Sequence, residues 1–207
     1  MSDPVQTVFV VDDDEFFLRG IQRLLRSSGY VSECFSSAGD FLARCPREAT
    51  GCVLADLQMP QMDGLALQAA LAQSANPLPV VFLTGQGDIP SSVAAMRGGA
   101  EDFLVKTAPK EAVIAAIERA LARDQLERRA RMRRLELERS CERLTPRERE
   151  VLHHVLKGLR NKQIAHAMNI DERSVKRHRT NLMKKLGVGS VAELIQIAVE
   201  AGLTQPE

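Results

Sequence analysis

Five polar residues in the first half of this 207-residue sequence lie at the ends of short, β-branched runs. They are Asp12, Asp13, Asp56, Thr84 and Lys106. Three carboxylates brought into one crevice repel one another and take up protons unless a cation lies among them. Oxygen ligands in this number suit a hard ion such as Mg²⁺, which readily takes a phosphate as a further ligand.

With such an ion and an ammonium group nearby, a carboxylate can attack phosphorus and form an aspartyl phosphate. In that chemistry Lys106 would neutralise phosphoryl oxygens, and Thr84 would donate a hydroxyl hydrogen bond to them. A solvated acid at a strand end explains any one of the five residues about as well. It is a much weaker explanation of all five together.

The runs that precede these residues are strand-sized and alternate with segments of helical periodicity. They are Val5 to Val11, Tyr30 to Phe35, Cys52 to Ala55, Val80 to Leu83 and Phe103 to Val105. Strands that alternate with helices predict an α/β domain with a five-stranded parallel sheet. The ligand crevice of such an open sheet lies at the carboxyl ends of its strands, where the five polar residues fall.

The charges divide the chain into two parts with different expected partners. Residues 1–124 hold 10 basic and 16 acidic side chains and residues 125–207 hold 18 and 11, although the whole chain has a net charge of only +1. An acidic half suits a cation and a basic half suits a polyanion. All Phe and Tyr residues lie at or before Phe103. The basic half therefore cannot stack bases on rings, which favours duplex DNA over RNA or single strands.

Several other classes of protein are disfavoured by the composition. The longest apolar runs are strand-sized, so we expect no membrane span. The start Met1-Ser2-Asp3-Pro4 lacks the pattern of a secretory signal, and we expect a cytoplasmic location. The four cysteines show no C-x-x-C spacing, which argues against a zinc site or a disulfide framework.

Residues 5 to 123, approximately, resemble the receiver domain of bacterial two-component response regulators. The resemblance is carried by Val10-Val11-Asp12-Asp13-Asp14, by the run from Asp56 to Gly64, and by Leu83-Thr84-Gly85, Gly99-Ala100 and Lys106. It implies a flavodoxin-like fold with Asp56 as the phosphoacceptor. It also implies a Mg²⁺ ion, with the following ligands: Asp12, Asp13, Asp56 and the backbone carbonyl of Gln58.

The same resemblance implies that Thr84 and Lys106 bind the phosphoryl group. Phe103 falls where the family has an aromatic switch residue that changes rotamer on activation, and a simple core Phe is the alternative. Receivers usually carry proline after the lysine, commonly joined by a cis peptide, but here Thr107 follows. A non-proline cis bond costs about 2.5–4 kcal/mol. The departure therefore leaves open whether the Lys106 side chain points in the direction that the family pattern implies.

Strong helix formers without Gly or Pro occupy residues 124–142, which predicts a helical linker. The helix before it opens at Pro109, and its apolar positions, expected to face the sheet, are Val113, Ile114, Ile117 and Leu121. The linker arginines are expected to form a solvated face rather than a DNA contact.

Three short helices are predicted after the linker. Thr145, Pro146 and Glu148 give the first one an N-cap and a capping box, and Gly158 ends it. A short second helix ends at Asn169, and a third runs from its cap Asp171 to Gly187. The third carries a basic stripe with a spacing of three and four residues, formed by Arg173, Lys176, Arg177, Thr180 and Lys184. A short helix, a tight turn and a basic helix predict a helix-turn-helix, with a charged surface helix of no special role as the alternative.

Residues 140 to 202, approximately, resemble the LuxR-type helix-turn-helix. The matching segments are Leu144 to Leu152, Gly158-Leu159, Asn161 to Ala165, Ser174 to Arg179 and Lys185 to Val188. The resemblance implies that three residues face base edges, namely Lys176, Arg177 and Thr180. It places five more near phosphates, namely Asn161, Lys162, Arg173, Arg179 and Lys184. One departure is Arg160, where the family usually has a Ser N-cap, worth about 1 kcal/mol.

Together the two resemblances imply a response regulator of the FixJ/NarL group, in three parts: a receiver at 1–123, a linker at 124–142 and an all-α DNA-binding domain at 143–207. A sensor histidine kinase would phosphorylate Asp56 with Mg²⁺ as the cofactor, which would shift dimerisation and the binding of duplex DNA. A homodimer on paired half-sites is expected, with RNA polymerase as a further partner.

Two rival classes stay open. One is a receiver that regulates DNA binding through a ligand or partner without phosphorylation. The other is a phosphatase that uses Asp56 as a turnover nucleophile. Such enzymes need a second acid two residues on, where this chain has Gln58, so we expect no enzyme activity.

Overall fold

The computed structural model describes residues 5–46, 48–85 and 89–200, with side chains up to residue 198. The N-terminal tetrapeptide, which lacks the pattern of a secretory signal, lies outside these residues. The chain divides into two compact units, an N-terminal unit of residues 1–128 and a C-terminal unit of residues 129–207. Each is described by itself.

A sheet of five parallel strands forms the centre of the N-terminal unit, as the alternation of strand and helix signals predicts. Its strands are β1 (Thr7–Val11), β2 (Val31–Phe35), β3 (Gly51–Ala55), β4 (Val80–Thr84) and β5 (Asp102–Val105). Their order in the sheet is β2-β1-β3-β4-β5. The strand order therefore reverses at β1, and the carboxyl ends of β1 and β3 flank the point at which ligands bind in such folds.

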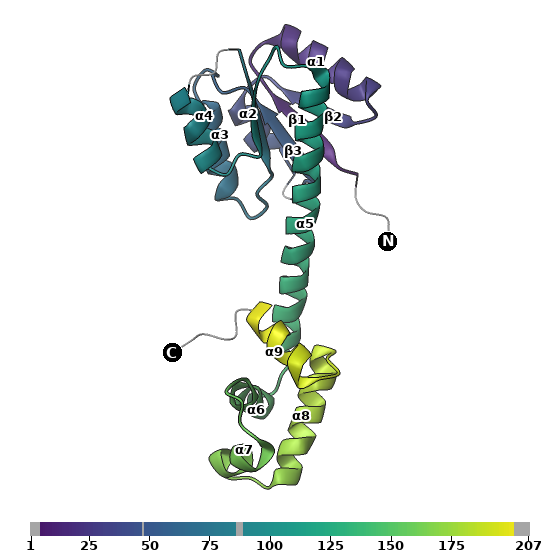
Figure 1. The fold of residues 1–207 in the computed structure, drawn as a ribbon, viewed down its shortest axis with the longest axis vertical. Helices are drawn as coiled ribbons and strands as arrows, with labels where there is room; N and C mark the ends of the chain where they lie inside the picture. Colours follow the sequence, from purple (N-terminus) through teal and green to yellow (C-terminus); the bar gives the residue numbers. More distant parts are fainter. Residues whose placement is uncertain (1–4, 47, 86–88, 201–207) are drawn as a thin grey trace. The chain divides into compact units, whose positions relative to one another are not determined.

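Five helices cover the two faces of this sheet (Figure 1). They are α1 (Glu15–Ser27), α2 (Ala38–Arg44), α3 (Gly64–Ala72), α4 (Ile89–Arg97) and α5 (Lys110–Glu142). Alternate residues of β1 face opposite ways: Val8 and Val10 pack with α1 and α5, whereas Phe9 and Val11 pack with α2, α3 and α4. The two faces thus have separate apolar cores, and both strands that carry acids are buried between them.

Aspartates begin the two helices that follow the acidic strand ends. Asp14 Oδ1 accepts hydrogen bonds from the N–H groups of Phe16 (2.8 Å) and Phe17 (3.2 Å), and so caps α1. Asp63 Oδ1 accepts one from Ala66 N–H (2.8 Å) and caps α3. The third acid of the Asp12-Asp13-Asp14 run therefore has a structural role at a helix N-terminus.

One continuous helix, α5, includes the predicted linker, residues 124–142. Its first part packs on the sheet through Val113, Ile117 and Leu121, as expected. Further along, Arg134 pairs with Glu138 at 2.9 Å, and both side chains are exposed. An i, i+4 pair of this kind fits the solvated face predicted for the linker arginines.

The C-terminal unit contains four further helices around one apolar core: α6 (Pro146–Leu156), α7 (Asn161–Met168), α8 (Glu172–Leu186) and α9 (Val191–Glu200). The first three confirm the prediction. The fourth helix, α9, was not predicted, and its Leu194 and Ala198 are almost fully buried. Ser190, with its hydroxyl accepting from Glu193 N–H at 3.2 Å, is the signal for its start.

The predicted helix ends are present. Thr145 and Glu148 form a reciprocal capping box, and Gly158 and Asn169 take left-handed backbone angles where α6 and α7 end. Arg160 makes no side-chain cap for α7, as its departure from the family pattern predicts. Gln163 Oε1 accepts a hydrogen bond from Arg160 N–H at 2.8 Å, so one half of the box remains.

Candidate functional site

Three carboxylates meet at the carboxyl ends of β1 and β3. Val11 lies opposite Ala55 in the sheet, and Asp56 N–H donates to Val11 O at 2.8 Å, which brings the residues after these strands together. Ligand oxygens of Asp12, Asp13 and Asp56 all lie within 4.8 Å of one another. Asp12 and Asp56 are buried and Asp13 is exposed. The predicted acid cluster is therefore present, with one side open to solvent.

The ammonium group of Lys106 lies between the two buried acids. Its Nζ is 2.6 Å from Asp12 Oδ2 and 2.8 Å from Asp56 Oδ2. Lys106 N–H donates to Thr84 O at 2.8 Å, so the ends of β4 and β5 are joined beside the acids. The structure thus brings four of the five strand-end side chains together, those of Asp12, Asp13, Asp56 and Lys106, and Thr84 adjoins them through its backbone carbonyl.

Burial and the neighbouring charges shift the pKa values of Asp12 and Lys106 in opposite directions. Burial raises the pKa of Asp12, and the contacts with Lys106 and with Asp14 N–H counter only part of this effect. Burial alone would lower the pKa of Lys106, but its contacts with Asp12 and Asp56 outweigh burial and raise it. Lys106 therefore stays charged in the crevice, where it can neutralise an anion.

The donor set fits a hard divalent cation. Three carboxylates supply oxygen ligands only, with no thiol or imidazole among them. Asp12 Oδ2 is buried and lies 2.6 Å from the Lys106 ammonium, and a carboxylate oxygen with one such contact keeps a second lone pair for a ligand. A surface cavity of about 560 Å³ opens beside Asp13 and Gln58, and gives access from solvent.

The loop after β3 is held close to the acids. Gln58 N–H donates to Asp56 Oδ1 at 3.3 Å, and Gly64 N–H donates to Leu57 O at 2.9 Å. A Cβ at Gly64 would lie 2.4 Å from Asp56 O and 2.8 Å from a ring carbon of Phe82. Only glycine fits here without moving the backbone of the acid loop.

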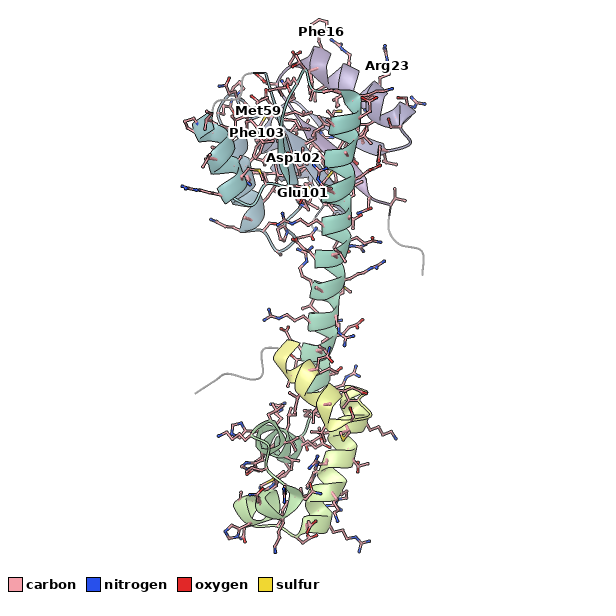
Figure 2. All side chains as sticks on the ribbon, viewed as in Figure 1. Phe16, Arg23, Met59, Glu101, Asp102 and Phe103 are labelled. Atoms are coloured by element: carbon pink, nitrogen blue, oxygen red, sulfur yellow. The ribbon has the colours of Figure 1, made fainter. Side chains whose placement is uncertain are left out.

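Phe103 packs at the border of the core beside this site. Its ring is partly buried, with its centroid 6.1 Å from that of Phe82 on the neighbouring strand. Figure 2 labels Phe103 and Met59, which belong to the same apolar cluster. Phe103 lies on β5, with β4 between it and the strand that Asp56 follows, on the face covered by α3 and α4.

The sequence patterns did not reveal two features of Lys106. Every peptide bond in the described residues is trans, the Lys106–Thr107 bond included. In addition, Lys106 Nζ lies 4.5 Å from the ring centroid of Phe17 on α1. The signal that could have indicated this contact is an aromatic residue in the first turn of the helix that follows Asp12 and Asp13.

The basic stripe predicted on the third helix of the C-terminal unit lies on the surface of α8. Its exposed members are Arg173, Lys176, Arg177, Thr180 and Lys184. Lys176 Nζ lies 3.4 Å from Glu172, and both side chains remain largely exposed. A basic helix with an apolar inner face and a charged outer face has the surface that major-groove binding requires.

Arg179 and Asn161 were both expected near phosphates, and they contact each other. Arg179 Nη1 donates to Asn161 Oδ1 at 2.6 Å, which links α8 to the first residue of α7. Asp171 caps α8 through Ser174 N–H at 2.8 Å and sets the turn between the two helices. Lys162, at the start of α7, is exposed. The start of α7 and the middle of α8 are thus fixed to one another by a side-chain contact.

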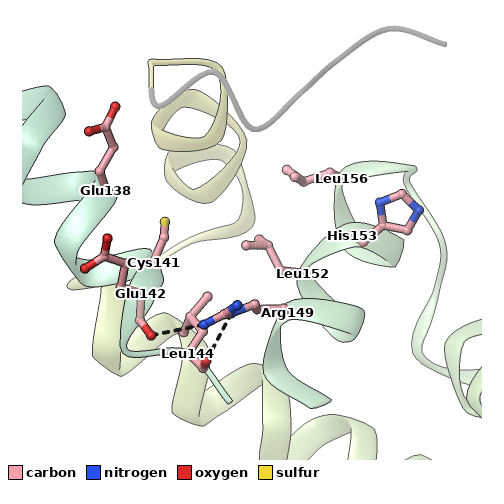
Figure 3. Close-up of a pocket in the computed structure, with 8 residues that line it drawn as sticks. All are labelled: Glu138, Cys141, Glu142, Leu144, Arg149, Leu152, His153 and Leu156. Carbon is pink, nitrogen blue, oxygen red and sulfur yellow. Dashed lines mark hydrogen bonds between the residues drawn. The ribbon is translucent and has the colours of Figure 1, made fainter. Parts of the chain in front are cut away.

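A second cavity, of about 470 Å³, lies in the C-terminal unit between the end of α5 and α6 (Figure 3). Its walls include Leu144, Leu152 and Leu156. The guanidinium of Arg149 donates to Leu144 O and Glu142 O, both at 3.1 Å, and so closes the turn between the helices. The surface of this cavity is mainly apolar. The guanidinium of Arg149 already donates to backbone carbonyls and does not offer a polar ligand site like those of the two candidate sites.

Comparison with known proteins gives matches along most of the chain. A family profile described as "Response regulator receiver domain" matches residues 8–118, and one described as "Bacterial regulatory proteins, luxR family" matches residues 142–198. Response regulator protein TodT of Pseudomonas putida is 40% identical over 197 residues, covering 95% of this chain and 87% of TodT. Tetrathionate response regulatory protein TtrR of Salmonella typhimurium is 42% identical over 190 residues, covering 92% and 90%.

Solved structures agree with these matches. The response regulator StyR has a TM-score of 0.83 and 43% identity, covering 95% of this chain and 100% of the StyR chain. Full-length FixJ from B. japonicum has a TM-score of 0.58 and 32% identity, covering 98% and 100%. Among the described helices, none is both long and apolar enough to cross a bilayer.

Proposed function

Since this chain belongs to the response regulators with a LuxR-type DNA-binding domain, which regulate transcription in two-component systems, we propose that phosphorylation of Asp56 controls its binding to duplex DNA. The phosphoryl donor is a sensor histidine kinase. The observation that carries the proposal is the contact of one ammonium, Lys106 Nζ, with Asp12 and Asp56 at 2.6 and 2.8 Å in a crevice that also contains Asp13.

Asp56 is the nucleophile in this proposal. One of its carboxylate oxygens forms a bond to phosphorus while the bond from phosphorus to the donor nitrogen breaks, and the electron pair leaves on that nitrogen, which takes up a proton. The ligands for Mg²⁺ are Asp12, Asp13, Asp56 and the backbone carbonyl of Gln58. When bound there, the ion supplies charge stabilisation for the phosphoryl oxygens.

Two neighbours of Asp56 complete the phosphoryl site. Lys106 already lies against Asp56 and offsets the charge that the phosphoryl group adds. Thr84 is buried at the end of β4 and donates its hydroxyl to a phosphoryl oxygen. Movement of Thr84 toward that oxygen leaves space into which Phe103 turns, and the surface formed by α4 and β5 repacks. This repacking biases a two-state domain toward its DNA-binding form.

The DNA-binding part of the proposal rests on the exposed basic stripe of α8. Base edges are read by Lys176, Arg177 and Thr180. Phosphates are contacted by Asn161, Lys162, Arg173, Arg179 and Lys184. Because each helix-turn-helix is small, the phosphorylated chain binds paired half-sites as a homodimer. RNA polymerase is a further partner, and the location is cytoplasmic.

The proposed division of labour follows the chain. Residues 1–123 form the receiver, residues 124–142 the linker and residues 143–207 the DNA-binding domain. The receiver does not turn over a phosphate ester as an enzyme, because Gln58 stands where a phosphatase of this chemistry needs a second acid.

Incubation with phosphoramidate and Mg²⁺ tests the proposal. Intact-mass measurement should find one added phosphate on the wild type and none on Asp56→Asn, which keeps the shape of the side chain but removes the nucleophile. A thermal denaturation curve of Asp56→Asn controls for folding. Equal labelling of both proteins would reject Asp56 as the site, and no labelling of the wild type by any donor would reject phosphorylation.

A further inference from the structure

We propose that Phe17 is a positioning residue for Lys106, and that the face of its ring holds the ammonium where it meets Asp56 and the phosphoryl group. This inference rests on the proposed phosphorylation of Asp56. The inference adds to the proposed function an aromatic residue from α1, at a site whose other residues follow strand ends.

The geometry places Lys106 Nζ in contact with three side chains from three elements. It lies 2.6 Å from Asp12 after β1, 2.8 Å from Asp56 after β3 and 4.5 Å from the ring centroid of Phe17 in α1. A cation within about 6 Å of a ring centroid is attracted by the negative face of the ring. Phe17 therefore acts on the same nitrogen atom as the two acids.

The backbone of Lys106 is held by its hydrogen bond to Thr84 O, but this bond does not fix the far end of the side chain. Thr107 follows Lys106, is exposed and lacks the fixed φ angle of a proline. The lysine side chain is a flexible four-carbon stem with a point charge at its end. The position of Lys106 Nζ must therefore be determined by the side chains that it contacts. Phe17 is the uncharged one among these, beside Asp12 and Asp56.

Phosphorylation of Asp56 would change the ion pair between Lys106 and Asp56, but it would leave the contact between Lys106 and the Phe17 ring unchanged. When an oxygen of Asp56 becomes bonded to phosphorus, the carboxylate charge that attracts Lys106 moves outward onto the phosphoryl group. The ring of Phe17 takes no part in that bond. It can hold the ammonium both before and after phosphorylation.

Phe17 is itself held in place by α1. Its N–H donates to Asp14 Oδ1 at 3.2 Å in the cap of the helix, and its ring packs against the apolar cluster formed with α5. The acidic run that supplies Asp12 and Asp13 to the cation site thus also supplies, through Asp14, the cap that orients Phe17.

The chain contains a matched control in the adjacent residue. Phe16 is 81% exposed and has the guanidinium of Arg19 4.8 Å from its ring centroid. Figure 2 shows Phe16 pointing outward from α1. Phe16 therefore has the same kind of cation contact, on the same helix turn, without a role at the acid cluster.

The first measurement uses NMR of the full chain without added metal. Protons above a ring face are shifted upfield, so the ε-CH₂ protons of Lys106 should be displaced in the wild type and in Phe17→Tyr, and should return toward ordinary lysine values in Phe17→Leu. Phe16→Leu should leave them unchanged. Unshifted Lys106 signals in the wild type would overturn the proposal.

The second measurement is the rate of phosphorylation by phosphoramidate. Phe17→Leu, which keeps apolar bulk but removes the ring face, should slow phosphorylation about two- to fivefold, the rate equivalent of one cation–π contact. Phe17→Tyr should retain the wild-type rate, and Phe16→Leu should not change it.

The outcomes separate this inference from the proposed function. A wild-type rate in Phe17→Leu, or an equal loss in Phe17→Tyr and Phe17→Leu, would overturn the positioning role while leaving Asp56 as phosphoacceptor. A wild type that takes up no phosphate would reject the proposed function, and the NMR comparison would still decide whether the ring holds Lys106. If Phe17→Leu fails to fold, Phe17→Met provides the same comparison.

Discussion

The carboxylate of Asp124, fully buried on α5, accepts a hydrogen bond from Gly51 N–H at 3.0 Å, at the start of β3. Gly51 has a φ of +138°, and a Cβ there would lie 1.8 Å from Thr7 O on β1. The residue at which the sequence predicts the linker to begin is therefore joined to the strand that carries Asp56 at its other end.

Removing this carboxylate should destabilise the N-terminal unit. Asp124→Ala leaves the buried Gly51 N–H without that acceptor, which should lower the free energy of unfolding by about 1–3 kcal/mol. Tyr30 is the only tyrosine of a chain without tryptophan, so its fluorescence during urea unfolding reports on this unit alone. Glu111→Ala removes an exposed ion pair with Lys110 and should cost at most about 1 kcal/mol. Equal stability of Asp124→Ala and wild type would contradict the assigned role.

Cys52 should be the least reactive thiol of the protein. Burial, with a smaller effect of the Asp124 charge, raises its pKa to about 12, so almost no thiolate exists at neutral pH. Iodoacetamide at mildly alkaline pH should label the partly exposed Cys34, Cys45 and Cys141 first. Peptide mass mapping checks the order, and urea should make Cys52 reactive. Early labelling of Cys52 in the folded chain would show that its strand is accessible.

The stability of the C-terminal unit should depend on pH through Glu148. Burial alone would raise the pKa of this carboxyl, but the hydrogen bonds from Lys185 Nζ (2.6 Å) and from Thr145 outweigh burial and lower it. Because the pKa of Glu148 is lower in the folded state than in the unfolded state, its carboxylate stabilises the fold. This stabilisation is complete above the ordinary pKa of 4.5 and is lost as the pH falls through the pKa of the folded state.

The test of this pH dependence is Glu148→Gln, which should flatten acid unfolding of the C-terminal unit and cost about 1–3 kcal/mol at neutral pH. Circular dichroism follows the helices of the whole chain, while Tyr30 fluorescence separates the N-terminal contribution. Glu150→Gln, which breaks an exposed pair with Arg147, serves as the matched control. A pH profile of Glu148→Gln that parallels the wild type would refute the assignment.

Two substitutions should distinguish phosphate contacts from base contacts. Lys162→Ala should weaken binding to all duplexes alike and reduce the slope of affinity against salt by about one unit. Arg177→Ala should cost about 1–3 kcal/mol on the preferred site and relax selectivity at one base position. Binding titrations at several salt concentrations measure both effects. Arg134→Ala, on the linker face, is the control that should change neither.

The sequence predicts the sheet well because β-branched runs and helical periodicity are local signals. It also predicts that Asp12 and Asp56 meet, since parallel strands place their carboxyl ends at one edge. What it could not predict depends on side-chain packing between distant segments. The contact of Lys106 with Phe17 requires the rotamers of both residues. Gln68, buried with its amide donating to Ala95 O at 3.0 Å between α3 and α4, has no sequence pattern that names its partner.

Gly64 shows how the acid site can fail without any change in its charges. A side chain there would act as a wedge between Phe82 and the backbone of Asp56. The wedge would displace Asp56, which follows β3, relative to Asp12, which follows β1, and the two acids would lose their shared contact with the Lys106 ammonium. The proposed phosphorylation of Asp56 should thus be lost by substitution at a position that has no functional group of its own.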